Sequence, residues 1–182
     1  MDGFYINLDR STDRRDAMES QLQALAMPWV RRFPALDGAL HPTPTGAALG
    51  AGERACFVSH AQAIAAPSAG GLRLVLEDDV QIAQDLPAII GGFGLSQLDA
   101  YDLVFLDCQP QVNAMALMTL WSCLQTHRIE SGSGRVGGVN LYDAGPLYQF
   151  GATGYLVTPA GRERLVPLLQ AELHSGPGEP FD

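Results

Sequence analysis

Three adjacent carboxylates, Glu77, Asp78 and Asp79, directly follow the short apolar segment Leu72–Leu76. We expect this segment to be a buried strand, and in open α/β sheets ligands bind beyond the carboxyl ends of the strands. Three neighbouring carboxylates repel one another unless a cation or a hydrogen-bond network compensates them, and their hard oxygen atoms suit Mg²⁺ or Mn²⁺. The triplet therefore indicates a divalent metal site. The alternative is a solvated acidic turn that caps the next helix.

A second polar group lies near the N-terminus, where Asn7 and Arg10 end a predicted strand at Gly3–Leu8 and Arg14 follows in the first turn of a predicted helix. Arg10 and Arg14 are four residues apart and share a helix face. Guanidinium groups beside free helix N–H groups form a site for phosphate or diphosphate. The local pattern by itself favours a solvated face on which Arg10 or Arg14 pairs with Asp9, Asp13 or Asp16.

A third group lies in the segment 52–60, which we expect to be helical. Helical spacing places Glu53, Cys56, Phe57 and His60 near one face, with a carboxylate and an imidazole two turns apart. Periodicity alone favours the interpretation of His60 as a structural histidine over that of a catalytic one. We also expect Cys56, Cys108 and Cys123 to be small buried hydrophobic residues, because they form no C-x-x-C motif and no Cys/His cluster with zinc spacing.

Strands that alternate with helices are expected to position these groups. The predicted strands are Gly3–Leu8, Trp29–Leu36, Leu72–Leu76, Tyr101–Leu106 and Thr153–Val157. The first predicted helix begins after Ser11 and ends before Pro28. The other predicted helices are Glu53–Ala66, Asp85–Ile90 and Pro159–Leu173, the last interrupted by Pro167. Pro34 favours an edge position for its strand, and the range 109–149 is expected to be irregular. This pattern predicts an α/β domain with a mostly parallel sheet flanked by helices.

The composition excludes several classes of function. The chain has 182 residues, of which 47% are hydrophobic, so we expect one domain with a sizeable core. It carries 11 basic and 20 acidic residues, a net charge of −9, and every basic residue is Arg. Such a chain is a poor partner for nucleic acid or anionic lipid, and it cannot perform chemistry that needs Lys. The sparse cysteines, the absence of a signal sequence and the lack of a long apolar run predict a soluble cytoplasmic protein.

Two segments resemble parts of a response-regulator receiver domain, namely the acidic pocket in Leu72–Val80 and the phosphoacceptor strand in Tyr101–Pro110. Receivers place a helix, a strand and a second helix between these parts, which needs about 30 residues before any loops. Only 27 residues separate Asp79 from Asp107, and the Lys of a receiver is missing. A receiver-like regulatory module is therefore the competing interpretation and not the main one.

Taken in order, the motifs resemble glycosyltransferase family 25, the lipopolysaccharide and lipooligosaccharide glycosyltransferases. The matching segments are Ile6-Asn7-Leu8-Asp9-Arg10-Ser11 with Arg14, Ala35-Leu36-Asp37-Gly38, Gly52-Glu53 with Cys56 and Ser59-His60, Leu76–Val80, Gly151–Thr158, and Pro180-Phe181-Asp182. Each match is weak alone, but five or more in register are fairly specific. Family members generally continue past Asp182, so we expect a truncated form or a short member.

The resemblance implies a GT-A-like, Rossmann-type fold and a metal-dependent, inverting transfer of a hexose, galactose or glucose, from a UDP-sugar to a lipooligosaccharide or other glycan or glycolipid acceptor. It implies that Glu77, Asp78 and Asp79 hold Mn²⁺ or Mg²⁺, and that the nucleotide-sugar site contains Asn7, Arg10, Arg14, Asp37 and Ser59. His60 and Asp182 are its candidates for catalytic residues, although Asp182 could equally be a metal or sugar ligand. The expected location is the cytoplasm, with at most peripheral contact at the inner face of the membrane. The alternative is a non-catalytic module, receiver-like or an inactive transferase remnant.

Overall fold

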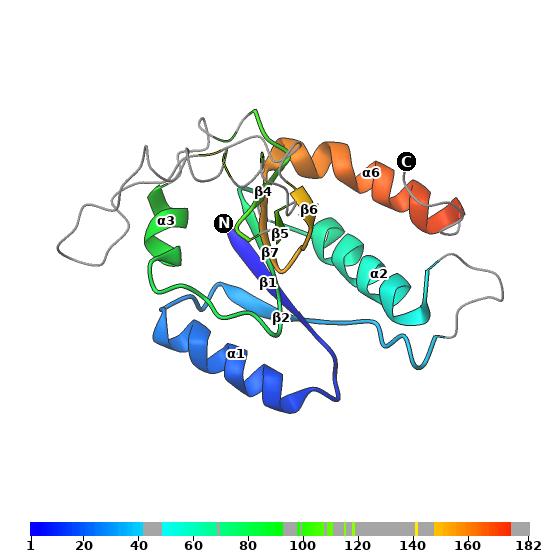
Figure 1. Ribbon diagram of the computed structural model, residues 1–182, viewed down its shortest axis with the longest axis horizontal. Helices are drawn as coiled ribbons and strands as arrows, with labels where there is room; N and C mark the ends of the chain where they lie inside the picture. Colours follow the sequence, from blue (N-terminus) through cyan, green and yellow to red (C-terminus); the bar gives the residue numbers. More distant parts are fainter. Residues whose placement is uncertain are drawn as a thin grey trace.

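The computed structural model describes residues 1–41, 49–68, 70–92, 98, 100–107, 109–110, 115, 118, 141 and 148–175 (Figure 1). In chain order the elements are β1 (Asp2–Asn7), α1 (Thr12–Ala24), β2 (Val30–Pro34), α2 (Ala51–Ala65), β3 (Arg73–Glu77), α3 (Leu86–Gly92), β4 (Leu103–Phe105), β5 (Gln109–Pro110), β6 (Tyr148–Phe150), β7 (Gly154–Val157) and α6 (Pro159–Ser175). The five predicted strands and four predicted helices are all present, with ends within a few residues of those expected. Most of the range 109–149, expected to be irregular, lies outside the described residues.

The main sheet has the strand order β2-β1-β3-β7-β4, and the short strands β5 and β6 form a separate pair. β1 is parallel to both β2 and β3, whereas β7 is antiparallel to both β3 and β4. The α/β class is confirmed, and β2 is an edge strand as Pro34 predicted. The expectation of a mostly parallel sheet is wrong, because β7 begins at the same edge at which β4 ends. Such a connection needs no crossover helix and produces an antiparallel pair.

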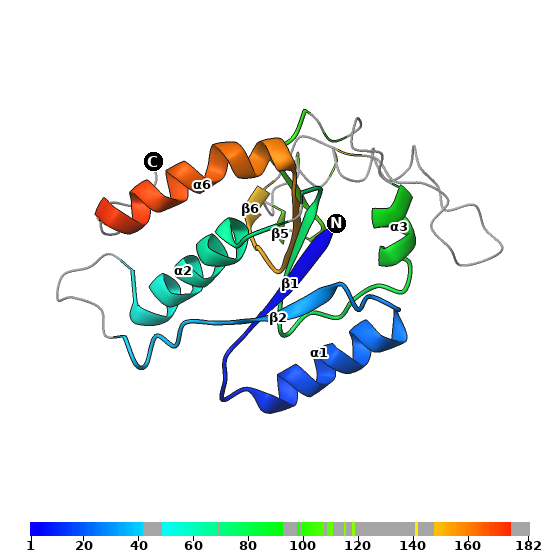
Figure 2. The same ribbon diagram turned by 180° about the vertical axis from the view of Figure 1, so that it is seen from behind.

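The two faces of the sheet are covered by different helices, as the two views show (Figures 1 and 2). Tyr5, Leu74 and Leu76 pack with the buried residues of α1 and α3 on one face. On the other face Phe4 and Val75 lie in a cluster with apolar residues of α2 and α6. Alternate strand residues thus serve opposite faces, which is the period-two pattern of a strand buried on both sides. The result is three layers, with helices on both sides of one sheet.

The helix α6 continues through Pro167, so its predicted interruption there is wrong. A proline inside a helix removes one backbone hydrogen bond and crowds the preceding turn. Leu165, Val166 and Leu169, on both sides of the proline, pack against the same apolar cluster beneath the helix. Packing of these three half-buried side chains holds both halves of the helix on the sheet despite the lost bond.

Arg73 joins the first strand, the third strand and the end of α2. Its side chain is fully buried and makes a two-pronged pair with Asp2, with N–O distances of 3.0 and 2.7 Å. The same guanidinium donates to the carbonyls of Ala63, Ile64, Ala66 and Pro67, at 2.8, 3.0, 2.7 and 2.9 Å. These carbonyls belong to the last turn of α2 and its exit, where a helix leaves its acceptors without backbone donors.

Candidate functional site

A cleft of about 400 Å³ opens at the carboxyl ends of β1 and β3. Because these strands are parallel and Ile6 pairs with Glu77, the segments that follow them emerge at the same edge of the sheet. The segment after β2 and the first turns of α2 complete the walls. Of the predicted site residues, those that line it are Arg10, Arg14, Asp37, Ser59, His60, Glu77, Asp78 and Asp79. The volume falls in the range of about 300–1,000 Å³ that is typical of ligand pockets.

Asn7 lies beneath the cleft and holds the carboxylate of Asp78. Its side-chain amide donates to Asp78 Oδ2 at 2.6 Å and to the carbonyl of Ser11 at 3.0 Å. Arg14 donates to the other oxygen, Oδ1, at 2.9 Å. A hydrogen-bond network and one cation therefore compensate the charge of Asp78, whose side chain is only 10% exposed. Asn7 is itself buried, so it positions the site from below.

Arg32 is a site-supporting residue that the sequence analysis missed. Its guanidinium donates to the side-chain oxygen of Asn7 at 2.8 Å and to the backbone carbonyl of Asn7 at 3.0 Å. It also pairs with Asp9. These contacts fix the orientation of the Asn7 amide, and with it the direction in which Asn7 donates to Asp78. Arg32 lies on an edge strand directly after the exposed Arg31, and the local sequence does not indicate that one of these two arginines supports the site.

Two arginines stand at the mouth of the cleft. Arg10 forms an ion pair with Asp37, and Arg14 lies 3.2 Å from Asp79 Oδ2 in addition to its bond with Asp78. Their side chains are 58% and 51% exposed. The two guanidinium groups therefore keep donors toward solvent beside the cleft. Such donors suit the oxygen atoms of a phosphate or diphosphate.

Ser59 lies in the wall but its hydroxyl is used internally. It accepts a hydrogen bond from the backbone N–H of Leu36 at 2.9 Å and donates one to the carbonyl of Ala55 at 2.6 Å. It thereby ties the segment that carries Asp37 to α2. The segment also approaches the start of α2 closely at Gly38, where the Cβ of any other residue would lie 2.5 Å from the carbonyl oxygen of Ala51. Ser59 thus fixes the position of Asp37.

The three carboxylates of the triplet have three different surroundings. Glu77, the last residue of β3, faces α2, where its Oε1 lies 3.5 Å from His60 Nε2. Asp78 points to Asn7 and Arg14. Asp79 is 49% exposed at the rim of the cleft. Carboxylate oxygens of Asp78 and Asp79 at an open cleft fit the hard donor set that Mg²⁺ and Mn²⁺ prefer.

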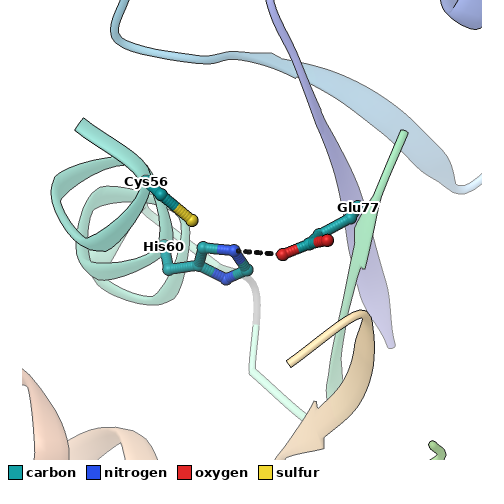
Figure 3. Close-up of side chains that lie close together, drawn as sticks. All are labelled: Cys56, His60 and Glu77. Carbon is teal, nitrogen blue, oxygen red and sulfur yellow. Dashed lines mark ion pairs between the residues drawn. The ribbon is translucent and has the colours of Figure 1, made fainter. Parts of the chain in front are cut away.

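Cys56, His60 and Glu77 form a compact group on the α2 side of the cleft (Figure 3). Their ligand-type atoms all lie within 4.8 Å of one another, and among the described residues no other three His, Cys, Asp or Glu side chains meet in this way. Cys56 is exposed, so its prediction as a buried hydrophobic residue is wrong. The predicted helix face explains why: residues 56 and 60 share the side of α2 that borders the cleft. Cys108 and Cys123 lie outside the described residues.

His60 also contacts Tyr155 of β7, a second residue that the sequence analysis did not assign to the site. The Nδ1 atom of His60 is 2.8 Å from the Tyr155 hydroxyl oxygen. Burial alone would lower the pKa of His60, but hydrogen bonds with Cys56 and Glu77 and the nearby charge of Glu77 raise that pKa to about 9. Burial raises the pKa of Tyr155, which keeps it a neutral phenol. His60 is therefore held in place from both ring nitrogens.

The geometry differs from that of a receiver domain. A doubly wound sheet of the order 2-1-3-4-5 places its acidic strand ends on neighbouring parallel strands. Here the antiparallel strand β7 lies between β3, which precedes the acidic triplet, and β4, which precedes Asp107. Thr153 donates to Asp107 Oδ2 at 3.1 Å on the far side of this strand. The predicted catalytic residue Asp182 lies outside the described residues.

The cleft with its carboxylates and two arginines lies beyond the carboxyl ends of the strands, which is where open α/β domains bind their ligands. Among the helices described, none combines the length and the apolar character needed to cross a membrane. The family model of glycosyltransferase family 25 (LPS biosynthesis protein) matches residues 1–174. The chain belongs to this family, so it is a glycosyltransferase of lipopolysaccharide biosynthesis, which takes a sugar donor and a glycan acceptor. No curated protein matches the chain in sequence.

Proposed function

We propose that the protein is a metal-dependent, inverting hexosyltransferase with a GT-A-like site, which transfers galactose or glucose from a UDP-sugar to a lipooligosaccharide or related glycan. The observation that carries this proposal is the cleft at the ends of β1 and β3, where Arg10 and Arg14 stand beside Asp78 and Asp79. A nucleoside diphosphate needs both kinds of group: donors for its oxygens and carboxylates for the cation that accompanies it.

In this proposal Arg10 and Arg14 bind the diphosphate, and Asp37 fixes Arg10 by the observed ion pair. Asp79 and Asp78 hold Mn²⁺ or Mg²⁺. When bound, that ion stabilises the negative charge that grows on the departing diphosphate. Asn7 keeps Asp78 oriented toward the cleft, and Ser59 keeps the Asp37 segment against α2.

An inverting transfer needs one base for the proton of the acceptor hydroxyl. His60 is paired with Glu77 and its pKa of about 9 keeps it protonated at neutral pH, so we assign it a positioning role. Asp182 stays the candidate for the base. We propose that the acceptor is met at the inner face of the membrane without a polybasic anchor, since the net charge of the chain is −9.

Calorimetric titration of UDP, with and without Mn²⁺, tests the donor site. We expect Mn²⁺-dependent binding that Asp79→Asn abolishes, because this change removes a charged oxygen ligand without changing the shape of the side chain. Asp16→Asn is the matched control, since Asp16 is an exposed carboxylate on α1 outside the cleft. UDP binding that is indifferent to both Mn²⁺ and Asp79 would contradict the metal assignment. Protein that binds should then be assayed with UDP-galactose and UDP-glucose, and the anomeric configuration of the product determined by NMR.

A further inference from the structure

The Cys56–His60–Glu77 group has a chemistry different from that of the proposed donor site. A thiolate and an imidazole are ligands for Zn²⁺ and similar transition-metal ions, whereas Mg²⁺ and Mn²⁺ favour oxygen atoms. Cys56 and His60 are four residues apart on α2 and project toward Glu77 at the end of β3 (Figure 3). Two elements thus present one sulfur, one nitrogen and one carboxylate to the same point.

We infer that Cys56, His60 and Glu77 form a second metal site of the protein, which takes Zn²⁺ or a chemically similar transition-metal ion. The site is separate from the Asp78–Asp79 cation site proposed above, and it depends on different side chains.

The spacing of the ligand atoms fits a tetrahedral ion. Bonds of about 2.0–2.3 Å in a tetrahedron separate neighbouring ligand atoms by about 3.3–3.6 Å. The distance from His60 Nε2 to Glu77 Oε1 is 3.5 Å, and the Cys56 sulfur lies within 4.8 Å of both groups. Cys56 is exposed, and in this proposal its side chain moves toward His60 and Glu77 when the ion binds. Binding forms one bond to each of the three ligands, while the Cys56 thiol and the Nε2 of the His60 imidazolium each release one proton to solvent.

Tyr155 is an independent observation in favour of the site. A metal-bound histidine almost always has a hydrogen-bond partner on its other ring nitrogen, which fixes the orientation of the ring. The Tyr155 hydroxyl lies 2.8 Å from His60 Nδ1, which leaves Nε2 directed toward Glu77 and Cys56. The phenol and imidazole rings also stack, with their centres 5.8 Å apart. Tyr155 therefore serves as a positioning residue that presents one nitrogen of His60 to the metal.

The position of the group suggests what the metal does. All three residues line the same cleft as Arg10 and Asp79. Three protein ligands leave the fourth position of a tetrahedral ion open, which is typical of metal sites that engage a bound molecule rather than only support the fold. The fourth position would face the cleft and accept water or an oxygen atom of a ligand held there.

Titration of the metal-free full-length chain with Zn²⁺, and in parallel with Co²⁺ as a spectroscopic probe, tests the site. We expect Zn²⁺ to bind one equivalent far more tightly than Mn²⁺, and Co²⁺ to give a thiolate-to-metal charge-transfer band together with the visible bands of tetrahedral cobalt. Cys56→Ser should abolish the charge-transfer band. Loss of a hydrogen-bond partner of a metal ligand lowers metal affinity about 10–100-fold, and His60→Gln and Glu77→Gln should each lower the Zn²⁺ affinity by more than that, because they remove a ligand itself. Tyr155→Phe should weaken Zn²⁺ about 10–100-fold while leaving the thiolate band in place.

Two controls separate this inference from the proposed function. Asp79→Asn should leave Zn²⁺ affinity unchanged while it removes Mn²⁺-dependent UDP binding, so failure of one proposal does not imply failure of the other. A Cys108→Ser/Cys123→Ser double variant should keep the thiolate band, because Cys56 alone supplies the thiolate. Far-ultraviolet circular dichroism confirms that each variant is folded. Zn²⁺ binding that is unchanged in folded Cys56→Ser, or a cobalt complex without a thiolate band, would overturn the inference.

Discussion

Replacement of Arg73 by Leu tests how much of the stability depends on one buried cation. Arg73 makes six hydrogen bonds, two to Asp2 and four to the carbonyls at the end of α2. The Ala63 carbonyl depends on it especially, because the residue four positions later is Pro67, which has no N–H to donate. Leu keeps much of the apolar stem beside Phe4 but removes every donor.

The expected cost follows from the acceptors that lose their donor. The bonds to Ala63 and Ile64 are buried, and each buried carbonyl left unpaired costs about 1–3 kcal/mol, or about 2–6 kcal/mol for the two. Removal of one partner from a buried ion pair costs about 3–5 kcal/mol by itself. The Asp2 side chain is 18% exposed and regains some water, which places the total toward the low end. The two ranges sum to about 5–11 kcal/mol, so we expect Arg73→Leu to lower the free energy of unfolding by about 5–6 kcal/mol. This is a large part of the total of about 5–15 kcal/mol that is usual for a folded domain.

Urea denaturation followed by circular dichroism measures this loss, and the same change should lower the melting temperature by about 10–24 °C. Arg31→Leu is the matched control, because Arg31 is exposed and its guanidinium lies 5.7 Å from the centre of the same Phe4 ring. We expect that control to cost about 0.5–1 kcal/mol at most. Arg73→Lys, which keeps the charge and three donors, should fall between the two. If Arg73→Leu unfolds within about 1 kcal/mol of the wild type, the reasoning from unpaired buried acceptors is refuted.

Two further perturbations test the same kind of argument. The pKa of Asp2 is lowered in the folded state, since hydrogen bonds with Arg73 and Ser68 and the charge of Arg73 outweigh the opposing effect of burial. The pair therefore stabilises the fold fully above the unfolded carboxyl pKa of 3.8, and this contribution is lost as the pH falls through the lower folded value. Asp2→Asn should be less stable than wild type at neutral pH, and the difference in urea midpoint should shrink below about pH 4; a constant difference would contradict this. Ser59→Ala leaves the Leu36 N–H without its acceptor and should cost about 1–3 kcal/mol in urea denaturation, while weakening UDP binding because the Asp37 segment loosens. Ser11→Ala is its control: the Ser11 side chain makes no capping bond, so little change is expected, and an equal loss in both variants would refute the role given to Ser59.

The positions of the main elements could be predicted because their signals are local. Leu72–Leu76 and Thr153–Val157 are apolar runs of strand length, and Pro28 and Pro67 mark where helices end. The meeting of Asn7 with Asp78 also follows from local patterns, although 71 residues separate them. Once two strands are parallel neighbours, the residues that end them must lie at the same edge of the sheet. The lining of the cleft was therefore largely predictable from strand ends and helix starts.

What could not be predicted depends on strand direction and on distant partners. No local pattern states that β7 enters the sheet antiparallel between β3 and β4. The direction of β7 places Tyr155 next to His60, although 95 residues separate the two in the sequence. Arg73 is a similar case, because a charged residue between two leucines of a strand is normally expected on an exposed face. Its burial is possible only because carbonyls of α2 and the carboxylate of Asp2 surround the same point, which no single segment reveals.

The division of the acidic triplet follows from strand geometry, and it decides how many cations the cleft can hold. Successive side chains of an extended strand point to opposite faces, so Glu77, still in β3, falls on the α2 face with Val75. Asp78 and Asp79 lie beyond the end of the strand, in a turn that directs them to Arg14. One ion cannot draw all three carboxylates together without unpairing Glu77 from His60. Two cations, one bound by oxygen atoms of Asp78 and Asp79 and one bound by Cys56, His60 and Glu77, leave Glu77 beside His60 and Asp78 beside Arg14. The separate responses of Asp79→Asn and Cys56→Ser to Mn²⁺ and Zn²⁺ are therefore the sharpest distinction between one metal in the cleft and two.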